Sequence, residues 1–494
     1  MKLYLSGHGY RYALEQIQLA LFPDEAMEYV EDPFAPGESG TVSALSRRGE
    51  TLLAETAITH GGKTTRAALS MPASEQTPVL VRQLLRRCYY QAALPHLAQV
   101  PVWGALSGVR PSKLTTRHIL QGGTFDSADE LLREVYAVSP DRRQLCLEAT
   151  KASLEAVKRS QDRDLSVYVG IPFCPTRCAY CSFVSASIRR EQGLLEPFFR
   201  GLLQEIRLTG PLMRASGWRV RSLYVGGGTP TTLSAEQLET LMAALREAFD
   251  LSGLLEYTVE AGRPDTLDLR KLRTLRAGGA DRVSINPQTM EDAVLRLAAR
   301  PHTAQDTVRA FHEAREAGFS CVNMDLIAGL PGDTPEGFAR SLDRVLALGP
   351  ENVTVHTLAL KKAADLYENR QGLLAAAQVA DMLSGAGERL RRGGYGPYYL
   401  YRQKYMSGSF ENIGWTLPGH TGWYNIYMME ELHPVLALGG GGVSKLVDRT
   451  TGRIQRFSNP KYPREYISRP DDIQSKKEAF FTALGQLPAS RGDK

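Results

Sequence analysis

The sequence contains no apolar run that approaches the roughly 20 residues needed to span a bilayer. Residues 1–10 lack a basic segment followed by an apolar core, so we expect no secretory signal peptide there. Neither sign of charge is in large excess, because 59 Lys and Arg stand against 54 Asp and Glu, a net charge of +5. This balance, without a long basic run, argues against nucleic acid as a partner. A mildly basic surface still helps to attract a small polyanion.

Cysteine is also scarce, with six residues in the whole chain. A disulfide framework would distribute its cysteines through a small secreted domain. Here three of the six fall within positions 174–181, and the other three are scattered. The pattern therefore predicts a protein of the reducing cytoplasm that carries one metal site.

A chain of 494 residues is too long for one ordinary domain, and its 43% hydrophobic and 23% charged residues are typical of globular proteins. We expect an N-terminal α+β domain of undefined role over residues 1–160, a β/α core over 161–372 and a mixed C-terminal region over 373–494 with a frayed tail. Periodicity in the first region predicts strands at Lys2–Ser6 and Thr51–His60 and a helix at Val79–Ala93.

Short β-rich runs alternate with helical periodicity from Leu165 onward. Strand, helix and strand repeated about six times predicts parallel strands joined by right-handed crossovers. Six such units form an open, TIM-like (β/α)6 barrel of the α/β class, with its site at the carboxyl ends of the strands. The predicted strands are Ser166–Ile171, Val220–Val225, Tyr257–Val259, Arg282–Ile285, Cys321–Ile327 and Asn352–Thr357.

Cys174, Cys178 and Cys181 form a CxxxCxxC pattern just past the first of these strands. Thiolates at this spacing suit zinc or an iron–sulfur cluster. Three protein ligands leave one iron of a [4Fe–4S] cluster open, and a chelating cofactor can bind there. The alternatives are a zinc loop with a distant fourth ligand and a set of free buried cysteines. The aromatic Tyr180 and the position in the barrel favour the open cluster of a radical S-adenosylmethionine (SAM) enzyme.

Gly226–Pro230 follows the second strand with three consecutive glycines. Glycines here expose backbone N–H and C=O groups and allow a ligand to approach closely. The alternative is a tight strand-to-helix turn, after which Ser234 and Gln237 form a capping box on the next helix. Because the loop follows the cysteine loop in one barrel, we expect it to hold the amino end of SAM.

Polar residues stand near the ends of later strands. Glu260 ends the third strand, Gln288 follows the fourth and Asp325 lies within the fifth. A carboxylate in a buried strand is costly unless it is paired, so each carboxylate is either a ligand contact or part of a structural ion pair. Asn323 and Asp325 share one face because strand side chains alternate. Together with Arg300, which follows a helix, these residues ring one barrel face, and this favours ligand contacts.

The segment Val169–Phe183, VGIPFCPTRCAYCSF, resembles the cluster loop of the oxygen-independent coproporphyrinogen III oxidase family of radical SAM enzymes. The likeness covers nearly the whole chain, most strongly from about residue 165 to 445. Other motifs similar to that family are Gly226–Pro230, Arg282–Gln288 and Asp325–Pro331. The HemZ-type subgroup is indicated by Gly108–Pro111, Glu260–Thr266, His356–Lys361 and Pro397–Lys404.

The resemblance implies an oxidoreductase of haem biosynthesis. In that family the reduced cluster splits SAM into methionine and a 5′-deoxyadenosyl radical, which takes a hydrogen atom from a propionate of coproporphyrinogen III. Loss of CO₂ and one electron leaves a vinyl group, and two rounds give protoporphyrinogen IX. The resemblance also implies an electron donor such as flavodoxin or ferredoxin, and a C-terminal region that covers the substrate.

The roles of individual residues follow from the same resemblance. The three cysteines bind the cluster, Tyr168 and Tyr180 flank it, and the strand ends hold SAM. The sequence departs from well-studied members at Gly170, where they carry His. The implied cofactor-binding residues are Tyr168, Tyr180, Gly227, Gly228, Thr229, Glu260, Gln288, Arg300, Asp325 and Ala359.

A porphyrinogen carries four carboxylates, so its binding surface should offer Arg, Lys and Tyr. An exposed basic face is the alternative for each such residue. The candidates are Arg263, Lys361, Lys362, Tyr399, Tyr401, Arg402 and Lys404.

Two other functions are compatible with this pattern. The first is haem ring opening coupled to methyl transfer by a radical SAM enzyme. The second is a non-catalytic haem-binding chaperone of the same superfamily. Those chaperones carry a His-Asn motif before the last Gly-rich strand, and Tyr424 stands here where the His would be.

Overall fold

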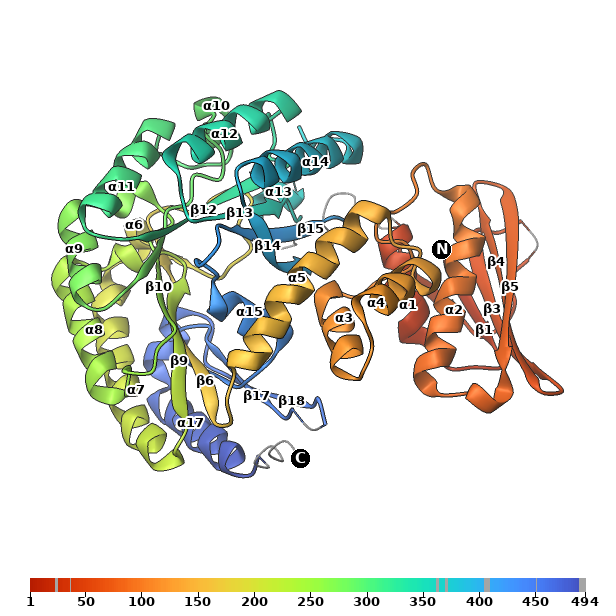
Figure 1. Ribbon diagram of the computed structural model, residues 1–494, viewed down its shortest axis with the longest axis horizontal. Coiled ribbons are helices and arrows are strands. Elements are labelled where there is room, and N and C mark those ends of the chain that lie inside the picture. The colour runs from red at the N-terminus through yellow and green to blue at the C-terminus, as the bar shows by residue number, and fades with distance from the viewer. Residues whose placement is uncertain are drawn as a thin grey trace. The chain divides into compact units, whose positions relative to one another are not determined.

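The computed structural model describes residues 1–22, 25–35, 37–360, 364–368, 372–403, 409–449 and 451–487 (Figure 1). Two compact units make up the chain. The first comprises Met1–Leu147 with Arg402–Phe410, and the second comprises Glu148–Tyr401 with Glu411–Lys494. The boundary falls within the helix α5 (Pro140–Arg159).

A five-stranded sheet forms the centre of the first unit, in the order β2-β1-β3-β4-β5. β1 pairs in parallel with β2 and β3, whereas β3, β4 and β5 are antiparallel neighbours. Alternation along β4 buries Leu52, Ala54 and Ile58 in one core with Leu85 and Cys88 of α2. The elements are β1 (Lys2–Ser6), β2 (Glu28–Val30), β3 (Gly40–Arg48), β4 (Thr51–His60), β5 (Lys63–Pro72), α1 (Arg11–Leu21), α2 (Pro78–Ala93), α3 (Pro111–Leu120), α4 (Phe125–Glu130) and a π-helical turn at Leu131–Val135.

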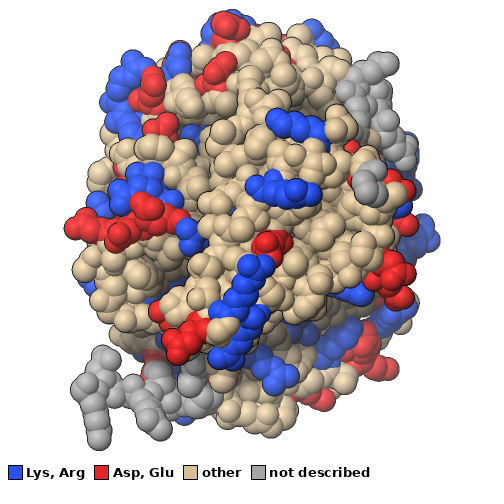
Figure 2. Space-filling model, turned by 90° about the vertical axis from the view of Figure 1, so that its right-hand side faces the viewer, with Lys and Arg blue, Asp and Glu red and all other residues tan. Residues whose placement is uncertain are grey.

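Charged side chains of both signs are interspersed on the molecular face shown in Figure 2. This mixture agrees with the near balance of acidic and basic residues in the sequence. Among the helices that the structure describes, none is both long and apolar enough to cross a membrane.

Six parallel strands with helical connections form the core of the second unit and confirm the predicted partial barrel. They are neighbours in the order β6-β9-β10-β11-β12-β13, and helices cover the outside of the sheet (Figure 1). The strands are β6 (Asp164–Ile171), β9 (Arg219–Gly227), β10 (Glu256–Glu260), β11 (Arg282–Ser284), β12 (Cys321–Ala328) and β13 (Asn352–Thr357). The helices are α7 (Leu195–Ser216), α8 (Ala235–Ala248), α9 (Leu269–Ala277), α10 (Asp292–Leu297), α11 (Ala304–Glu316) and α12 (Pro335–Leu348).

Local signals set where these helices begin and end. The hydroxyl of Ser234 accepts the N–H of Gln237, and the Gln237 side chain accepts the N–H of Ser234, so the predicted capping box starts α8. Gly349, with a φ of 70°, ends α12 in the left-handed conformation that glycine tolerates. The parallel strands end on the same side of the barrel, and the cysteine loop lies there, directly after β6.

The segment after residue 373 extends the barrel sheet at both of its edges. β15 (Glu411–Thr416) pairs antiparallel with β13, and β16 (Val435–Gly439) pairs parallel with β6. With β14 and with β17 and β18 beyond, 11 strands among the described residues form one sheet. The remaining elements of this segment are β14 (Gly396–Arg402), β17 (Val443–Val447), β18 (Ile454–Ser458), α14 (Ala376–Arg392), α15 (Trp423–Glu430), α16 (Pro463–Ser468) and α17 (Pro470–Gly485), and α13 (Asp365–Glu368) precedes it.

Glu205 on α7 is a buried carboxylate that joins several elements of this unit. Lys477 of α17 places its Nζ 2.9 Å from one carboxylate oxygen, and both side chains are at most 4% exposed. The same carboxylate accepts the N–H of Gly439 at 2.7 Å, the amide of Asn459 at 2.8 Å and the hydroxyl of Tyr466 at 2.6 Å. Because its oxygens are fully used, this ion pair ties α17 and the last strands to the barrel.

We therefore expect Glu205→Ala to lower the free energy of unfolding by about 3–5 kcal/mol, since it leaves the Lys477 ammonium buried without its partner. The control is Asp343→Ala, which removes an ion pair with Arg389 whose two side chains are 59% and 32% exposed. That control should cost less than about 1 kcal/mol. Denaturant unfolding followed by circular dichroism measures both variants, and equal losses would contradict this account.

Candidate active site

The cysteine loop begins where the first barrel strand ends. Cys174 lies in β7 (Phe173–Cys174), a short strand that pairs in parallel with β8 (Ala186–Ser187) just before α6 (Ile188–Glu191). The amide of Cys181 donates to the carbonyl of Cys178 at 3.0 Å, so these two cysteines share one turn. Cys178 is buried, the other two are half-buried, and the three thiols are close enough to interact electrostatically. The structure thus brings the three predicted ligands together.

The Gly-rich loop packs directly on the cysteine loop. The N–H of Thr229 donates to the carbonyl of Phe173 at 2.7 Å, and its hydroxyl donates to Cys174 Sγ at 3.5 Å. A Cβ atom at Gly228 would lie 2.5 Å from the Phe173 oxygen and 2.9 Å from Cys174 Sγ. Only glycine permits this approach, so the loop positions the cysteines as well as turning the chain into α8.

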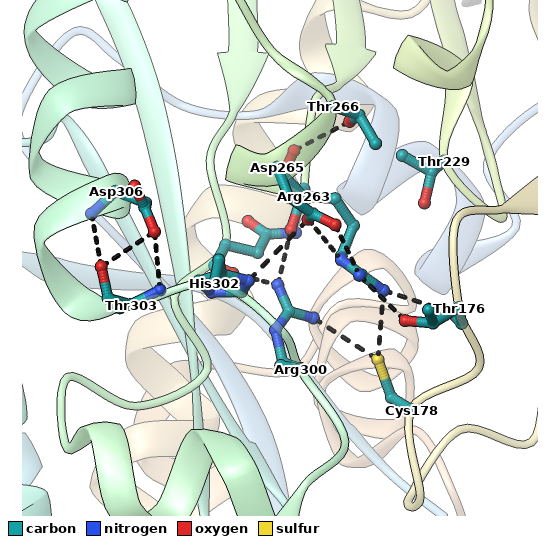
Figure 3. Close-up of polar contacts among 12 residues, drawn as sticks. Thr176, Cys178, Thr229, Arg263, Asp265, Thr266, Arg300, His302, Thr303 and Asp306 are labelled. Carbon is teal, nitrogen blue, oxygen red and sulfur yellow. Dashed lines mark hydrogen bonds and ion pairs between the residues drawn. The ribbon is translucent and has the colours of Figure 1, made fainter.

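The donor set suits an iron–sulfur cluster. Burial raises the pKa of the Cys181 thiol to about 11, so its thiolate forms when a metal displaces the proton. The guanidinium groups of Arg263 and Arg300 lie 3.7 and 3.8 Å from Cys178 Sγ, within hydrogen-bonding distance of a sulfur ligand (Figure 3). Three thiolates in one loop can each bind a different iron of a four-iron cluster and leave the fourth iron open.

Glu260 ends β10, and its half-buried carboxyl group lies beside the Gly-rich loop. The hydroxyl of Tyr224 donates to its Oε1 at 2.5 Å. Burial raises the pKa of Glu260 to about 7, and the hydrogen bonds from Tyr224 and from the Gly227 amide offset only part of this rise. Gly227 has a φ of 111°, which directs that backbone toward the site. A carboxylate held in this way is suited to receive a cationic ligand group.

Asp325 on β12 has the opposite electrostatic behaviour. Burial alone would raise its pKa, but hydrogen bonding to His356, Asn323 and Thr354 holds the pKa below its ordinary value. Asn323 Nδ2 donates to Oδ1 at 2.8 Å, which confirms that the two side chains share a face. His356 Nε2 lies 3.6 Å from Oδ2. Asp325 therefore stays ionised, while Glu260 titrates near neutrality.

Gln288 presents an unused hydrogen-bond acceptor. Its φ of 66° is in the left-handed region, and its N–H donates to the carbonyl of Asp325 at 2.8 Å. Such a strained backbone persists where the surroundings fix it, and it often marks a ligand site. Its Oε1 is buried and has no partner among the described residues. A ligand hydroxyl or ammonium group would satisfy this oxygen.

Arg300 is buried after α10 and spans several backbone segments. Its Nη2 donates to the carbonyls of Gly262 at 2.8 Å and Asn286 at 2.7 Å, and its Nη1 donates to the hydroxyl of Tyr180 at 3.0 Å. Its Nε is a buried donor without a partner in the part of the chain that the structure describes. Ala359, the remaining residue predicted for this pocket, follows β13 and is half-buried.

The aromatic residues predicted beside the cluster take different positions. Tyr180 lies in the cysteine loop, whereas Tyr168 lies on β6 and stacks on Tyr224 at a centroid distance of 6.3 Å. Gly170, where relatives in the predicted family carry His, faces the backbone of the last Gly-rich strand. A Cβ atom there would lie 2.8 Å from the carbonyl oxygen of Gly440. The approach of this backbone to β6 explains why the residue is glycine.

Most residues predicted for the substrate mouth are either buried in other contacts or lie outside the described residues. Arg263 is only 4% exposed and is bound to the cysteine loop, so its assignment to the mouth is corrected. Arg402 is buried in the first unit, where it donates to the carbonyls of Leu106 and Ser409. Tyr399 is buried and stacks on Tyr401. The predictions for Lys361, Lys362 and Lys404 lie outside the described residues.

Several residues that contact the predicted site residues were not assigned to the site from the sequence. Tyr224 is the donor to Glu260, and Tyr424 of α15 stacks on it with ring centroids 4.5 Å apart. His302 is buried beside Asp265, which holds Arg263. Position after a barrel strand was a usable signal for Arg263 and Asp265, but no sequence pattern indicates the tyrosine stack.

Comparison with known proteins identifies the class of this protein. Residues 168–345 match the radical SAM superfamily, whose members use a [4Fe–4S] cluster and SAM. The oxygen-independent coproporphyrinogen-III oxidase-like protein HemZ of Bacillus subtilis is 38% identical over 410 residues, which cover 82% of each chain. The chain belongs to this family of oxygen-independent coproporphyrinogen III oxidase-like radical SAM proteins.

Other similar proteins share a smaller part of the chain. The oxygen-independent coproporphyrinogen III oxidase of Escherichia coli is 39% identical over 42% of this chain and 45% of its own length. The haem chaperone HemW of Bacillus subtilis is 35% identical over 42% of this chain and 53% of its own length. The chain thus spans about half the length of these two relatives. The solved structure of HemN from Escherichia coli superposes with a TM-score of 0.53 and 29% identity, covering 66% of this chain and 73% of that one.

The raised pKa of Glu260 predicts how pH affects stability in protein without SAM. Between its ordinary pKa of 4.5 and the folded value of about 7, the folded state holds the proton more tightly, so stability falls as pH rises. The fall should amount to about 3 kcal/mol, at about 1.4 kcal/mol per pKa unit. Glu260→Gln removes this contribution, so its unfolding free energy relative to wild type should increase across that window. A difference that is constant from pH 4.5 to 7.5 would be inconsistent with the burial described.

Proposed function

We propose that this protein is an oxygen-independent coproporphyrinogen III dehydrogenase of the cytoplasm. It converts two propionate side chains of coproporphyrinogen III to vinyl groups, with release of CO₂, and gives protoporphyrinogen IX. The observation that carries the proposal is one site in which a three-cysteine loop, a Gly-rich loop and two carboxylates adjoin, in a chain 38% identical to HemZ. The similarity to the Escherichia coli oxidase supports the choice of substrate.

Cys174, Cys178 and Cys181 would hold the cluster in this proposal, with Tyr180 beside it. When bound, the cluster and SAM supply a carbon radical that takes a hydrogen atom from the substrate. The chain's own residues bind and orient the cofactor and keep water from the site. The tyrosines Tyr168, Tyr224 and Tyr424 stack in sequence, and this stack, in which Tyr424 is buried and the other two are half-buried, provides an aromatic wall for this purpose.

The SAM contacts follow from the polar atoms that the site leaves available. Glu260 and the Gly-rich loop residues Gly227, Gly228 and Thr229 would receive the cationic amino end of SAM. The buried Oε1 of Gln288 would accept a ligand hydroxyl, and the buried Nε of Arg300 would donate to its carboxylate. Asp325 and Ala359 would complete the pocket. The reaction also needs an external one-electron donor, such as flavodoxin or ferredoxin.

The second candidate function is that of a haem chaperone, because HemW proteins are among the relatives. A chaperone that ligates haem needs an accessible ligand near the last Gly-rich strand. Tyr424, at the position considered for that ligand, is 5% exposed and packs on Tyr224, and its N–H donates to Glu256 at 3.0 Å. This packing favours the enzyme.

The substrate is tested by anaerobic turnover. Cluster-loaded protein, SAM, a reductant and coproporphyrinogen III should yield 5′-deoxyadenosine and a porphyrin with two fewer carboxyl groups, both followed by mass spectrometry. 5′-Deoxyadenosine without any change in the porphyrin would reject the substrate while keeping the cofactor assignment. A biliverdin-like pigment formed from haem would indicate ring opening instead.

The cluster ligands are tested with Cys178→Ala and with Cys321→Ala as the matched control. Cys321 is a buried cysteine on β12 whose thiol donates to Asn352, away from the cysteine loop. Cys178→Ala should lose the iron–sulfur absorbance and at least 100-fold of SAM cleavage, because one iron loses its protein ligand. The control should retain both, and full cleavage by Cys178→Ala would overturn the assignment.

A further inference from the structure

Two arginines reach the same cysteine from different parts of the barrel. Arg263 follows β10 and Arg300 follows α10, and their Nη1 atoms lie 3.7 and 3.8 Å from Cys178 Sγ. Figure 3 shows both guanidinium groups directed at this sulfur. Cys178 is only 8% exposed, so these N–H groups contact it without competition from bulk water.

Arg263 is fixed on every side by hydrogen bonds. Asp265 binds it through two oxygens, with Nε to Oδ1 and Nη2 to Oδ2 both at 2.9 Å. The carbonyl and hydroxyl of Thr176, within the cysteine loop, accept its Nη1 and Nη2 at 3.1 Å each. A planar guanidinium can make all these contacts at once, and lysine cannot. Arg263 therefore fastens the cysteine loop to the end of β10.

Asp265 remains available to hold Arg263. The ring of His302 lies 3.9 Å from Asp265 Oδ1, and its side chain is fully buried. Burial, together with Arg300, lowers the pKa of His302 to about 3, so the ring is neutral at ordinary pH. Arg263 is thus the cation that pairs with Asp265, and this pairing offsets the formal charge of Arg263 near Cys178.

The buried Nε of Arg300, which has no partner among the described residues, is suited to bind SAM. Arg263 has no such atom directed at SAM, and its burial excludes it from the substrate mouth, so its position needs another explanation. Hydrogen bonds to the sulfurs and nearby charge tune the reduction potential of an iron–sulfur cluster. Reduction adds one negative charge, and a fixed N–H donor at a ligand sulfur stabilises that added charge more than the oxidised state. Such a donor shifts the reduction potential in the positive direction.

We propose that Arg263, held by Asp265, is a positioning residue that anchors the cysteine loop through Thr176 and raises the reduction potential of the cluster through its hydrogen bond to Cys178. This inference rests on the proposed ligation of a cluster by the three cysteines. It goes beyond that proposal by giving this chain's Arg-Pro-Asp segment a role in electron acceptance. Easier reduction would allow a weaker biological donor to start the reaction.

The test compares Arg263→Met, Asp265→Asn and the control Arg273→Met in full-length protein reconstituted anaerobically with iron and sulfide. Arg273 is an exposed arginine of α9 that pairs with Glu316 on α11, so it matches the residue type without contact to the site. Iron and sulfide per chain are measured first. Potentiometric titration followed by electron paramagnetic resonance then gives the midpoint potential of each protein.

Arg263→Met should make the cluster about tenfold harder to reduce, a negative shift of about 59 mV for one electron. Asp265→Asn should shift the potential in the opposite, positive direction, because it removes a negative charge beside the cysteine loop while the hydrogen bonds from Arg263 to Thr176 and to the side-chain oxygen that remains at position 265 still hold Arg263 at Cys178. Arg273→Met should match wild type. Opposite shifts in two neighbouring variants are not expected from general loss of structure.

If both cluster-loaded variants have the wild-type potential, this inference is overturned. If the wild-type protein also cleaves SAM, the proposed function still stands. If Arg263→Met takes up too little iron to titrate, Asp265→Asn decides, since an unchanged or negative shift contradicts the proposal. A wild-type protein that binds no cluster would remove both the proposed function and this inference.

Discussion

The close contact between two loop backbones is the constraint on which the site depends. Thr229 donates to the carbonyl of Phe173, and Gly228 approaches that carbonyl at a distance that no side chain would allow. This contact sets Cys174 beside the end of β9, while Arg263, which follows β10, and Arg300, which follows α10, contact Cys178. The cysteine loop is therefore fixed by the barrel at both ends, so the metal-binding geometry is prepared by the fold itself.

The two carboxyl groups of the site, Glu260 and Asp325, have pKa values shifted in opposite directions. Glu260 receives hydrogen bonds from the Tyr224 hydroxyl and the Gly227 amide and titrates near neutrality, whereas Asp325 has several side-chain partners and stays ionised. Neither arrangement is optimal for stability, because a buried acceptor or carboxylate is costly until a ligand pairs with it. Oε1 of Gln288 and Nε of Arg300, which have no partner among the described residues, have the same character. Polar groups left unsatisfied in one pocket are expected of a site that binds a zwitterionic cofactor.

The sequence allowed the barrel strands to be predicted within a few residues, because buried parallel strands are short apolar runs between helices with clear caps. It did not indicate β3 and β5, whose small and polar residues give a weak alternating pattern, or that β15 and β16 pair with the barrel strands β13 and β6. Strand pairing across more than 250 residues, as between β6 and β16, leaves no local periodicity. The cysteines and strand-end residues could be predicted from their position. Arg263 was assigned to the substrate mouth because the sequence around it reveals neither that the side chain is buried nor that it binds Asp265.

The central claim is that the three cysteines leave one iron open for SAM. Electron paramagnetic resonance of the reduced, cluster-loaded protein before and after addition of SAM tests it most directly. The account predicts a [4Fe–4S] signal whose g-values change when SAM binds, because the ligand then coordinates the open iron. An unchanged signal, or one equivalent of zinc in place of iron in anaerobically purified protein, would contradict it.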